Sequence, residues 1–211
     1  MTALDWPGCR NARDVGGLPT VDGLVVRAAA LYRSDGLFRL SEAGVAAVRA
    51  AALARIVDLR WQYEVESDPG PFAGDANYRH VPMLEDVLGY EVRHDTYGPM
   101  LDHNRSRIAD AFRALASAPE QGAVVVHCHG GRDRTGVLVA LALSVTGVPA
   151  AEIVDDYGRS PDGLPITMTN TLAHLDERYG GAEPYLRRIG IAASEIAAVR
   201  RRLVGRPKQF G

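Results

Sequence analysis

The chain has 211 residues, and its 24 Lys and Arg against 26 Asp and Glu give a formal net charge of −2. Hydrophobic residues at 46% and charged residues at 24% are globular averages, which exclude a disordered or a fibrous chain. The near-neutral charge gives no electrostatic basis for nucleic acid as the main partner, and no apolar run approaches the roughly 18 residues of a transmembrane span.

The N-terminal residues and the cysteine count bear on the compartment. Residues 1–6 have neither a basic start nor an apolar stretch, so no secretory signal is predicted. The two cysteines, Cys9 and Cys128, are too few for a disulfide framework, which favours a reducing compartment. We therefore expect a cytoplasmic protein, and export by a route that needs no signal peptide stays open.

The first half of the chain alternates predicted strands with predicted helices. Asp22-Gly23 between apolar residues predicts a hairpin over 20–26, and Ser41 can cap the first helix, whose apolar face is Val45, Val48 and Ala52. Further strands are predicted at residues 30–34, 55–59 and 77–82, and a helix with one buried face at residues 105–118.

Residues 123–127 form an apolar run without alternation. Such a strand is buried on both faces, in the middle of a largely parallel sheet. A helix follows it directly, and helices at about 150–159, 166–179 and 194–203 close the chain. Strands alternating with helices, then helices alone, predict a single α/β domain over residues 1–211, with a mostly parallel central sheet flanked by helices and a helical C-terminal half.

The segment between that strand and its helix, His127-Cys128-His129-Gly130-Gly131-Arg132-Asp133-Arg134-Thr135, carries the chemistry. It lies at the carboxyl end of a central strand, where open α/β sheets bind ligands. Gly130 and Gly131 let the backbone curl so that several N–H groups point inward as an anion nest. The positive end of the following helix and the guanidinium of Arg134 add to this field. The segment therefore predicts a site for a dianion such as a phosphate group.

Cys128 is the predicted nucleophile of this site. A free thiol has a pKa of about 8.5, and helix N-termini and cationic neighbours lower it to roughly 3.5–7.5. The field that binds phosphate would thus also hold a thiolate facing phosphorus. Thr135 can donate its hydroxyl to the sulfur and help it leave. A buried structural cysteine is the alternative, but it would not predict the neighbouring Gly130, Gly131 and Arg134.

This segment resembles the signature of the cysteine-based protein tyrosine phosphatase superfamily, which is His-Cys, five residues, Arg, then Ser or Thr. Here these positions are His127, Cys128, Arg134 and Thr135. Other segments, in a fixed order along most of the chain, resemble the bacterial and fungal branch called tyrosine phosphatase family 3, which includes secreted mycobacterial enzymes. These segments are residues 11–17, 32–35, 57–60 and 155–160.

The resemblance implies a protein tyrosine phosphatase-like fold and a two-step hydrolysis of phosphate monoesters. In the implied reaction Cys128 attacks phosphorus to give a phosphocysteine, water hydrolyses it, and Arg134 clamps the phosphoryl oxygens. No metal and no cofactor are needed. The branch accepts phosphotyrosine and, in some members, phosphoserine, phosphothreonine or phosphoinositides. It commonly has Lys where this chain has Arg132, a bulkier group that can alter which substrate fits.

The general acid is the least determined residue, although it contributes roughly 10²–10⁴-fold to such rates. Because the loop itself wraps the non-bridging oxygens, an acid delivered from elsewhere is favoured. Asp86 is the first candidate: it follows a strand that ends at Pro82, the place where superfamily members carry their acid. Glu85 and Asp102 are rivals. Asp133, inside the loop, is a fourth candidate, and Asp is typical of the branch at that position.

The remaining predicted site residues bind substrate or support the loop. Substrate binding is assigned to His129, Gly130, Gly131, Arg132, Asp133 and Arg134. His127 is expected to orient the loop through backbone hydrogen bonds, and Asp14 to lie in a turn near the site. Asp58 and Arg60 are expected to form an internal ion pair. His127 and His129 flank the thiol without a carboxylate at ligand spacing, so no metal site is predicted.

A protein tyrosine phosphatase is the function that the sequence favours. A phosphoinositide or dual-specificity phosphatase is the alternative, and convergence of Arg13, His129 and Arg132 on the site would favour such a polyanionic headgroup. An inactive phosphate-binding module is remote, because Cys128 and Arg134 are both present.

Arginines cluster near the C-terminus of the chain. Residues 200–202, with Arg206 and Lys208, are expected to form a solvated helix face, and attraction of anionic lipid or acidic protein is the lesser alternative. No oligomeric state is predicted.

Overall fold

The computed structural model describes residues 1–205. Four short strands come first, strands and helices then alternate up to α5 except that α3 and α4 are consecutive, and from α5 to α9 the chain is helical, as predicted. The elements in chain order are β1 (Thr2–Ala3), β2 (Arg13–Asp14), β3 (Val25–Val26), β4 (Leu31–Ser34), the 3₁₀ helix η1 (Leu37–Arg39), α1 (Glu42–Ala50), β5 (Arg55–Asp58), α2 (Gln62–Ser67), β6 (Tyr78–His80), α3 (Gly98–His103), α4 (Arg105–Ala116), β7 (Val124–His127), α5 (Asp133–Val145), α6 (Ala150–Gly158), α7 (Pro165–Tyr179), α8 (Ala182–Arg188), α9 (Ala193–Leu203) and β8 (Val204–Gly205).

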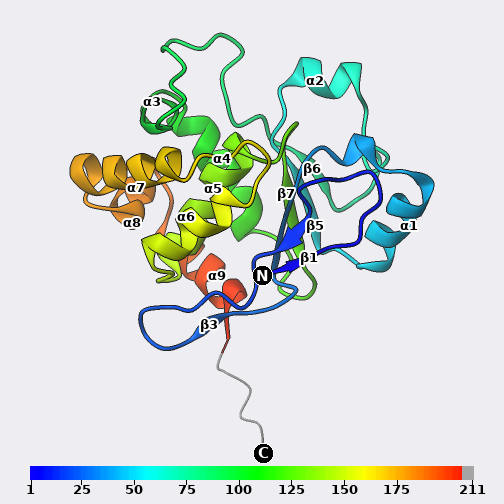
Figure 1. The fold of residues 1–211 in the computed structure, drawn as a ribbon, viewed down its shortest axis with the longest axis horizontal. Coiled ribbons are helices and arrows are strands. Elements are labelled where there is room, and N and C mark those ends of the chain that lie inside the picture. Colours follow the sequence, from blue (N-terminus) through cyan, green and yellow to red (C-terminus); the bar gives the residue numbers. More distant parts are fainter. Residues whose placement is uncertain (206–211) are drawn as a thin grey trace, which may run out of the picture.

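Within residues 1–205 the main sheet has six strands in the order β1-β2-β4-β7-β5-β6. The four strands β4, β7, β5 and β6 are parallel to one another, whereas β1 and β2 are added antiparallel at one edge. The prediction of a mostly parallel sheet flanked by helices is therefore confirmed. Figure 1 shows the sheet at the centre, with α1 and α2 on one side and the helices from α3 to α9 on the other.

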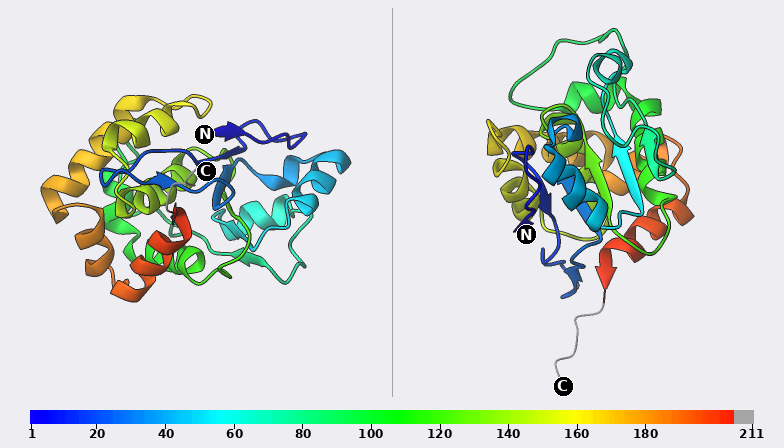
Figure 2. Two further views of the ribbon diagram at one scale, coloured as in Figure 1. Left: turned by 90° about the horizontal axis from the view of Figure 1, so that it is seen from below. Right: turned by 90° about the vertical axis from the view of Figure 1, so that its right-hand side faces the viewer.

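The central strand β7 is buried on both faces, as its apolar run predicted. Val124 and Val126 belong to the large core that includes Phe112 of α4 and Leu138 of α5. Val125 points the other way, into the smaller core under α1. Figure 2 shows these two layers from other sides. At roughly 1.5–3 kcal/mol for each fully buried valine, the two cores fix the register of β7 and hence where the segment after it begins.

Helix α5 is buried on almost its whole circumference. From Arg134 to Leu143 every residue is buried, which is the pattern of a helix enclosed by other helices. Its neighbours are α4, α6, α8 and α9. Because α5 cannot shift without disturbing all of these contacts, its N-terminus is a rigid support for the segment that joins it to β7.

The hairpin predicted over residues 20–26 forms, with its first arm shifted toward Leu18. The Gly23 amide closes the turn on the Thr20 carbonyl at 3.0 Å, the amides of Thr20 and Val26 donate to the carbonyls of Leu24 and Leu18 at 3.0 and 2.8 Å, and Pro19 and Val25 are antiparallel partners. The amide of Val21 lies outside this pairing and donates to the carbonyl of Gly147 at 2.8 Å. The second arm, β3, pairs with β8 from the far end of the chain. The Ser41 cap is confirmed, because its hydroxyl accepts from the Gly44 amide at 3.2 Å.

The expectation of a solvated arginine face over residues 200–202 is wrong for Arg202. Its guanidinium is buried and donates to the carbonyl oxygens of Ala118 and Gly122 at 2.9 and 3.0 Å, closing the end of α4. Arg206 and Lys208 lie outside the described residues. Over residues 1–205, no helix has both the length and the apolar character needed to cross a membrane.

Candidate active site

The carboxyl ends of the parallel strands bring the site residues to one edge of the sheet. Ser34 ends β4 and Asp58 ends β5, and both are register partners of His127 at the end of β7. Polar side chains therefore gather where a parallel sheet exposes its ligand-binding edge. Cys128 is the first residue beyond this edge.

Residues 128–132 form a tight loop around the Cys128 sulfur. The amide of Gly131 donates to Sγ at 3.2 Å, and the side chain of Cys128 lies at the bottom of the loop with only 2% of its surface exposed. Gly131 has φ +68°, and a Cβ there would lie 2.4 Å from the carbonyl oxygen of Ser34, so only glycine fits. The amide and the start of α5 both lie next to the sulfur, as an anion-binding loop requires.

Arg134 lies in the first turn of α5 and is held by Glu64 of α2. Its terminal nitrogens lie 2.5 and 3.1 Å from the two carboxylate oxygens of Glu64, and its guanidinium lies 4.5 Å from the centre of the Trp61 ring. Burial opposes the charge of Arg134, but Glu64 and the Cys128 sulfur outweigh it and raise the Arg134 pKa. Glu64 thus fixes the guanidinium of Arg134 where it interacts electrostatically with the Cys128 sulfur.

The back of the loop is held by two buried side chains that reach its carbonyl groups. Asn11 Nδ2 donates to the carbonyls of Gly130 and Gly131 at 3.3 and 3.0 Å. Arg33 Nη2 donates to the Gly131 carbonyl at 2.8 Å. Since these carbonyls are bound from behind, the amide groups of the loop are left to face the sulfur side, as an anion nest requires.

Asp156 of α6 supports both of these side chains. It accepts from Arg13 Nε at 2.8 Å and from Arg33 Nη1 at 2.5 Å, and all three side chains are buried. Arg13 Nη1 in turn donates to the Asn11 side chain. Burial and the nearby Arg33 lower the pKa of Arg13 to about 10, whereas the two arginines hold the pKa of Asp156 below its usual range against the effect of burial.

His127 and Asp58 form a second buried polar group beneath the loop. Burial lowers the His127 pKa. Its Nδ1 lies 3.5 Å from the Cys128 carbonyl and its Nε2 3.7 Å from Asp58. Asp58 also accepts from Arg60 Nη2 at 2.7 Å, which confirms the predicted internal ion pair. Burial opposes ionisation of Asp58, but His127 and Arg60 outweigh it and lower the Asp58 pKa.

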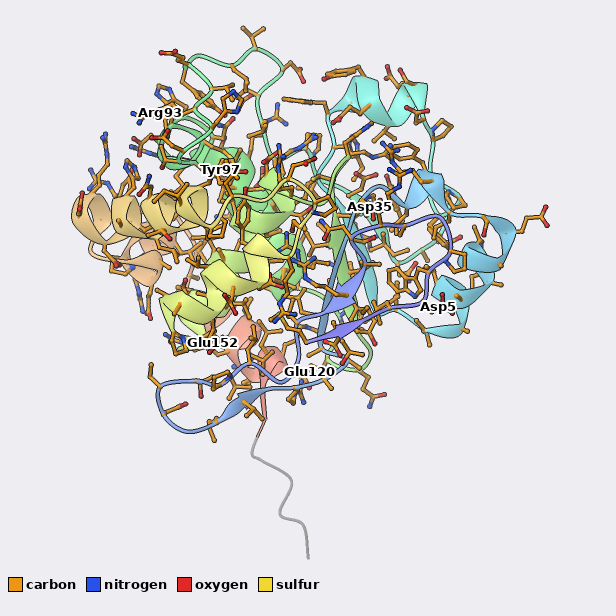
Figure 3. The ribbon with its side chains drawn as sticks, in the orientation of Figure 1. Asp5, Asp35, Arg93, Tyr97, Glu120 and Glu152 are labelled. Atoms are coloured by element: carbon orange, nitrogen blue, oxygen red, sulfur yellow. The ribbon has the colours of Figure 1, made fainter. Side chains whose placement is uncertain are left out.

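A cleft of about 400 Å³ opens in front of the loop. From the loop and the start of α5, Arg132, Asp133 and Arg134 line it, whereas Cys128, His129, Gly130 and Gly131 do not. Most of the other lining residues are apolar and aromatic side chains of Trp61, of residues 84–100 and of Leu164. In Figure 3, Tyr97 and Arg93 mark the wall contributed by the long connection between β6 and α3. The cleft is therefore polar at the loop and apolar toward its mouth.

Of the four acid candidates, the structure brings only Asp133 into this cleft. Its Oδ1 accepts from Arg132 Nε at 2.8 Å and from the hydroxyl of Tyr97. Asp86 is exposed and does not line the cleft. Glu85 forms an ion pair with an arginine of α4, and Asp102 accepts from the ring of a histidine on α7, both outside the cleft.

Three further predicted residues lie at the site with differing contacts. His129 lies between Glu64, at 3.5 Å, and Arg39, whose Nη2 is 2.8 Å from its Nε2. Thr135 Oγ1 is buried and has no hydrogen-bond partner among residues 1–205, so the predicted bond to the sulfur is not formed in this structure. Asp14 accepts from the amides of Gly16 and Ala29 at 2.8 and 2.7 Å, which places it in a turn as expected.

The sequence interpretation missed Glu64, Trp61 and Tyr97. Glu64 is four residues after Arg60, on a short helix that buries none of its side chains, so no periodic pattern indicated it. Tyr97 follows a long irregular connection. In the part of the chain that is described, no three His, Cys, Asp or Glu side chains are grouped as metal ligands.

A family model and two relatives of this chain are described as phosphatases. A family model described as "Tyrosine phosphatase family" matches residues 4–167. The chain is 28% identical to a tyrosine-protein phosphatase of Nostoc commune, over 88% of this chain and 78% of that protein. It is 26% identical to the triple specificity protein phosphatase PtpB of Mycobacterium tuberculosis, over 85% and 76%. The crystal structure of TpbA from P. aeruginosa covers 84% of this chain and 88% of its own at 18% identity, with a TM-score of 0.43.

Proposed function

The chain belongs to the tyrosine phosphatase family and is a tyrosine phosphatase, and from that premise we propose that it works through a phosphocysteine intermediate on Cys128. One observation carries the proposal. The Cys128 sulfur accepts from the Gly131 amide, at the start of α5, and its charge raises the pKa of the nearby Arg134. An anion-binding loop that holds a sulfur at its base is suited to attack on phosphate.

In the first step the Cys128 thiolate forms a bond to phosphorus, and the bond between phosphorus and the ester oxygen breaks. Negative charge on the non-bridging oxygens is stabilised by the loop amides and by Arg134, whose contacts with Glu64 use only its terminal nitrogens. The tyrosine oxygen leaves with a proton. The products are a phosphocysteine and the free hydroxyl of the substrate.

Asp133 is the acid that we propose for this proton. It lines the cleft beside Arg134, and the hydroxyl of Tyr97 and Arg132 hold its carboxyl group in place. In the second step the same carboxylate takes a proton from water as the water attacks phosphorus. Inorganic phosphate and the Cys128 thiolate are then released.

The surroundings of the basic residues support phosphotyrosine over a polyanionic lipid headgroup. Arg13 faces Asp156 behind the loop, and His129 lies between Glu64 and Arg39, so neither joins Arg132 in the cleft. The arginines that do line the cleft, Arg93, Arg132 and Arg134, are each paired with a carboxylate. The aromatic side chains of the cleft suit a phenyl ring. The cytoplasmic location stays a prediction.

The test is hydrolysis of a phosphotyrosine peptide by the wild type and by Cys128→Ser. We expect the substitution to lower kcat by roughly 10³-fold or more, because it removes the nucleophile. Cys9→Ser is the matched control and is expected to keep wild-type activity, since Cys9 is outside the loop. Activity that persists in Cys128→Ser, or that a metal chelator abolishes, would contradict the proposal.

A further inference from the structure

The exposed large apolar side chains of the described protein are concentrated around one opening. Within residues 1–205 there are seven of them: Val21, Val25, Tyr63, Val87, Val92, Leu164 and Ile166. The last five belong to the segments that surround the mouth of the cleft, and we call these five the apolar rim. A cluster of this kind marks a binding surface, whereas single exposed apolar residues need no explanation.

The apolar rim is continuous with the cleft. Val92 and Leu164 line it directly, and Ile166 is two residues further along the chain at the start of α7. Tyr63 stacks on Trp61, another residue of the cleft wall, with ring centres 5.6 Å apart and an interplanar angle of 19°. Figure 1 shows α2, the connection from β6 to α3 and the start of α7 around the same end of the sheet.

The charges beside the apolar rim disfavour a membrane as its partner. Residues 85–95 contain four carboxylates against one arginine. Arg93 is paired with Asp95, and Glu85 with Arg107, whereas Asp86 and Glu91 form no salt bridge with the described residues. Surfaces that dock on anionic lipid carry clustered Lys and Arg. An apolar rim beside the carboxylates of residues 85–95 instead suits an uncharged or basic peptide with apolar side chains.

We propose that the apolar rim selects phosphotyrosine peptides whose residues next to the phosphotyrosine are large and apolar. This inference rests on the function proposed above and names the substrate class of that site. An extended peptide advances about 3.4 Å per residue, so residues within three positions of the phosphotyrosine lie within roughly 10 Å of it along the chain. With the phosphate bound at the loop, those neighbours meet the mouth of the cleft and bury the rim side chains.

The experiment compares two phosphotyrosine peptides of equal length and charge. One carries Leu and Val at the two positions on each side of the phosphotyrosine, and the other carries Ser and Gln. We expect kcat/KM to be roughly tenfold higher for the apolar peptide, as burial of two or three apolar side chains at a partly open surface would give. A phosphatidylinositol phosphate in vesicles is the third substrate and is expected to be the poorest.

Substitutions in the apolar rim test whether these side chains cause the preference for the apolar peptide. Val92→Ser combined with Leu164→Ser is expected to bring the kcat/KM ratio of the two peptides close to one; Leu164 is the N-cap residue of α7, where serine is well tolerated. Val21→Ser is the matched control. It removes a valine that is more exposed than either of these two residues and whose amide contacts Gly147, beyond the far end of α5 from the site, and it is expected to keep the wild-type ratio.

Equal kcat/KM for both peptides, with hydrolysis intact, would overturn the rim proposal and leave the proposed function standing. Faster hydrolysis of the vesicle substrate than of the apolar peptide would overturn it in favour of a membrane. A ratio that survives the double substitution would also overturn it. No hydrolysis of either peptide would instead refute the proposed function, on which the rim proposal rests.

Discussion

Behind the active-site loop, buried polar side chains bind its carbonyl groups, whereas in front of the loop a cleft with mostly apolar walls opens to solvent. The rear contacts join residues that are far apart in sequence and leave the loop one conformation: Asn11 to Gly131, and Arg13 and Arg33 to Asp156. The front has exposed apolar side chains, among them Val87, Val92 and Leu164. The difference indicates a division of work, in which rigid geometry serves the chemistry and an adaptable surface selects the substrate.

The largest expected effect comes from breaking the rear with Asp156→Ala. This substitution leaves Arg13 and Arg33 buried without their carboxylate, and we expect it to lower the free energy of unfolding by roughly 3–5 kcal/mol, the range seen when one partner of a buried ion pair is removed. Urea unfolding of the two proteins measures it. Asp155→Ala is the control, because Asp155 is exposed on the same helix, and a change within about 0.5 kcal/mol is expected.

The ion pairs of Asp156 with Arg13 and Arg33 also predict how folding stability depends on pH. The pKa of Asp156 is lower in the folded protein than in the unfolded chain, so its stabilisation is complete above its unfolded value near 3.9 and is lost as the pH falls through the folded value. Below about pH 4 the wild type should therefore lose stability more steeply than Asp156→Ala. Parallel pH profiles for the two proteins would contradict an ionised Asp156.

At the junction of rear and front, Glu64→Gln should reduce activity more than stability. The carboxylate of Glu64 fixes the guanidinium of Arg134 beside the sulfur, and the neutral amide would bind it less firmly. We expect kcat/KM for phosphotyrosine to fall roughly 10- to 100-fold, the cost of a poorly oriented transition-state contact. Glu66→Gln, on the same helix and exposed, is the control. Wild-type kcat/KM in Glu64→Gln would show that Arg134 needs no such partner.

The smallest expected effect is on kcat and comes from Tyr97→Phe, a substitution in the cleft in front of the loop. Tyr97 donates to the proposed acid Asp133, so we expect kcat to fall roughly tenfold for phenyl phosphate and less for p-nitrophenyl phosphate, whose leaving group needs less protonation. Tyr90→Phe removes another hydroxyl of the same cleft and should affect both substrates equally. An equal loss on both substrates in Tyr97→Phe would mean that the hydroxyl does not act through the acid.

The sequence predicted the strand, loop and helix that carry Cys128, but it did not predict the distant side chains that hold this loop in place. The strand β7, the loop after it and α5 were found because an apolar run, two glycines and a periodic helix are local signals. Glu64 and Asn11 reach the loop from 70 and 120 residues away in sequence. No local pattern encodes such a contact, and Asn11 was noted only within a segment that resembles the family.

Asp86 illustrates the same limit for the acid. Its position after a strand that ends at Pro82 made it the first candidate, yet the chain then runs outward and leaves its side chain exposed beyond the cleft. Asp133 was favoured less because the loop was expected to face only the non-bridging oxygens. The Tyr97 and Arg132 contacts, which hold its carboxyl group in the cleft, depend on the tertiary structure.

The most direct test of this account is to trap the intermediate. The enzyme is mixed with excess phosphotyrosine peptide, quenched with acid within one turnover, and digested, and the peptide that contains Cys128 is analysed by mass spectrometry. The account predicts a phosphoryl group on the Cys128 sulfur, and none on the Cys9 peptide of the same sample. A phosphoryl group on a different residue, or its absence from Cys128 while phosphate is released in a burst, would contradict it.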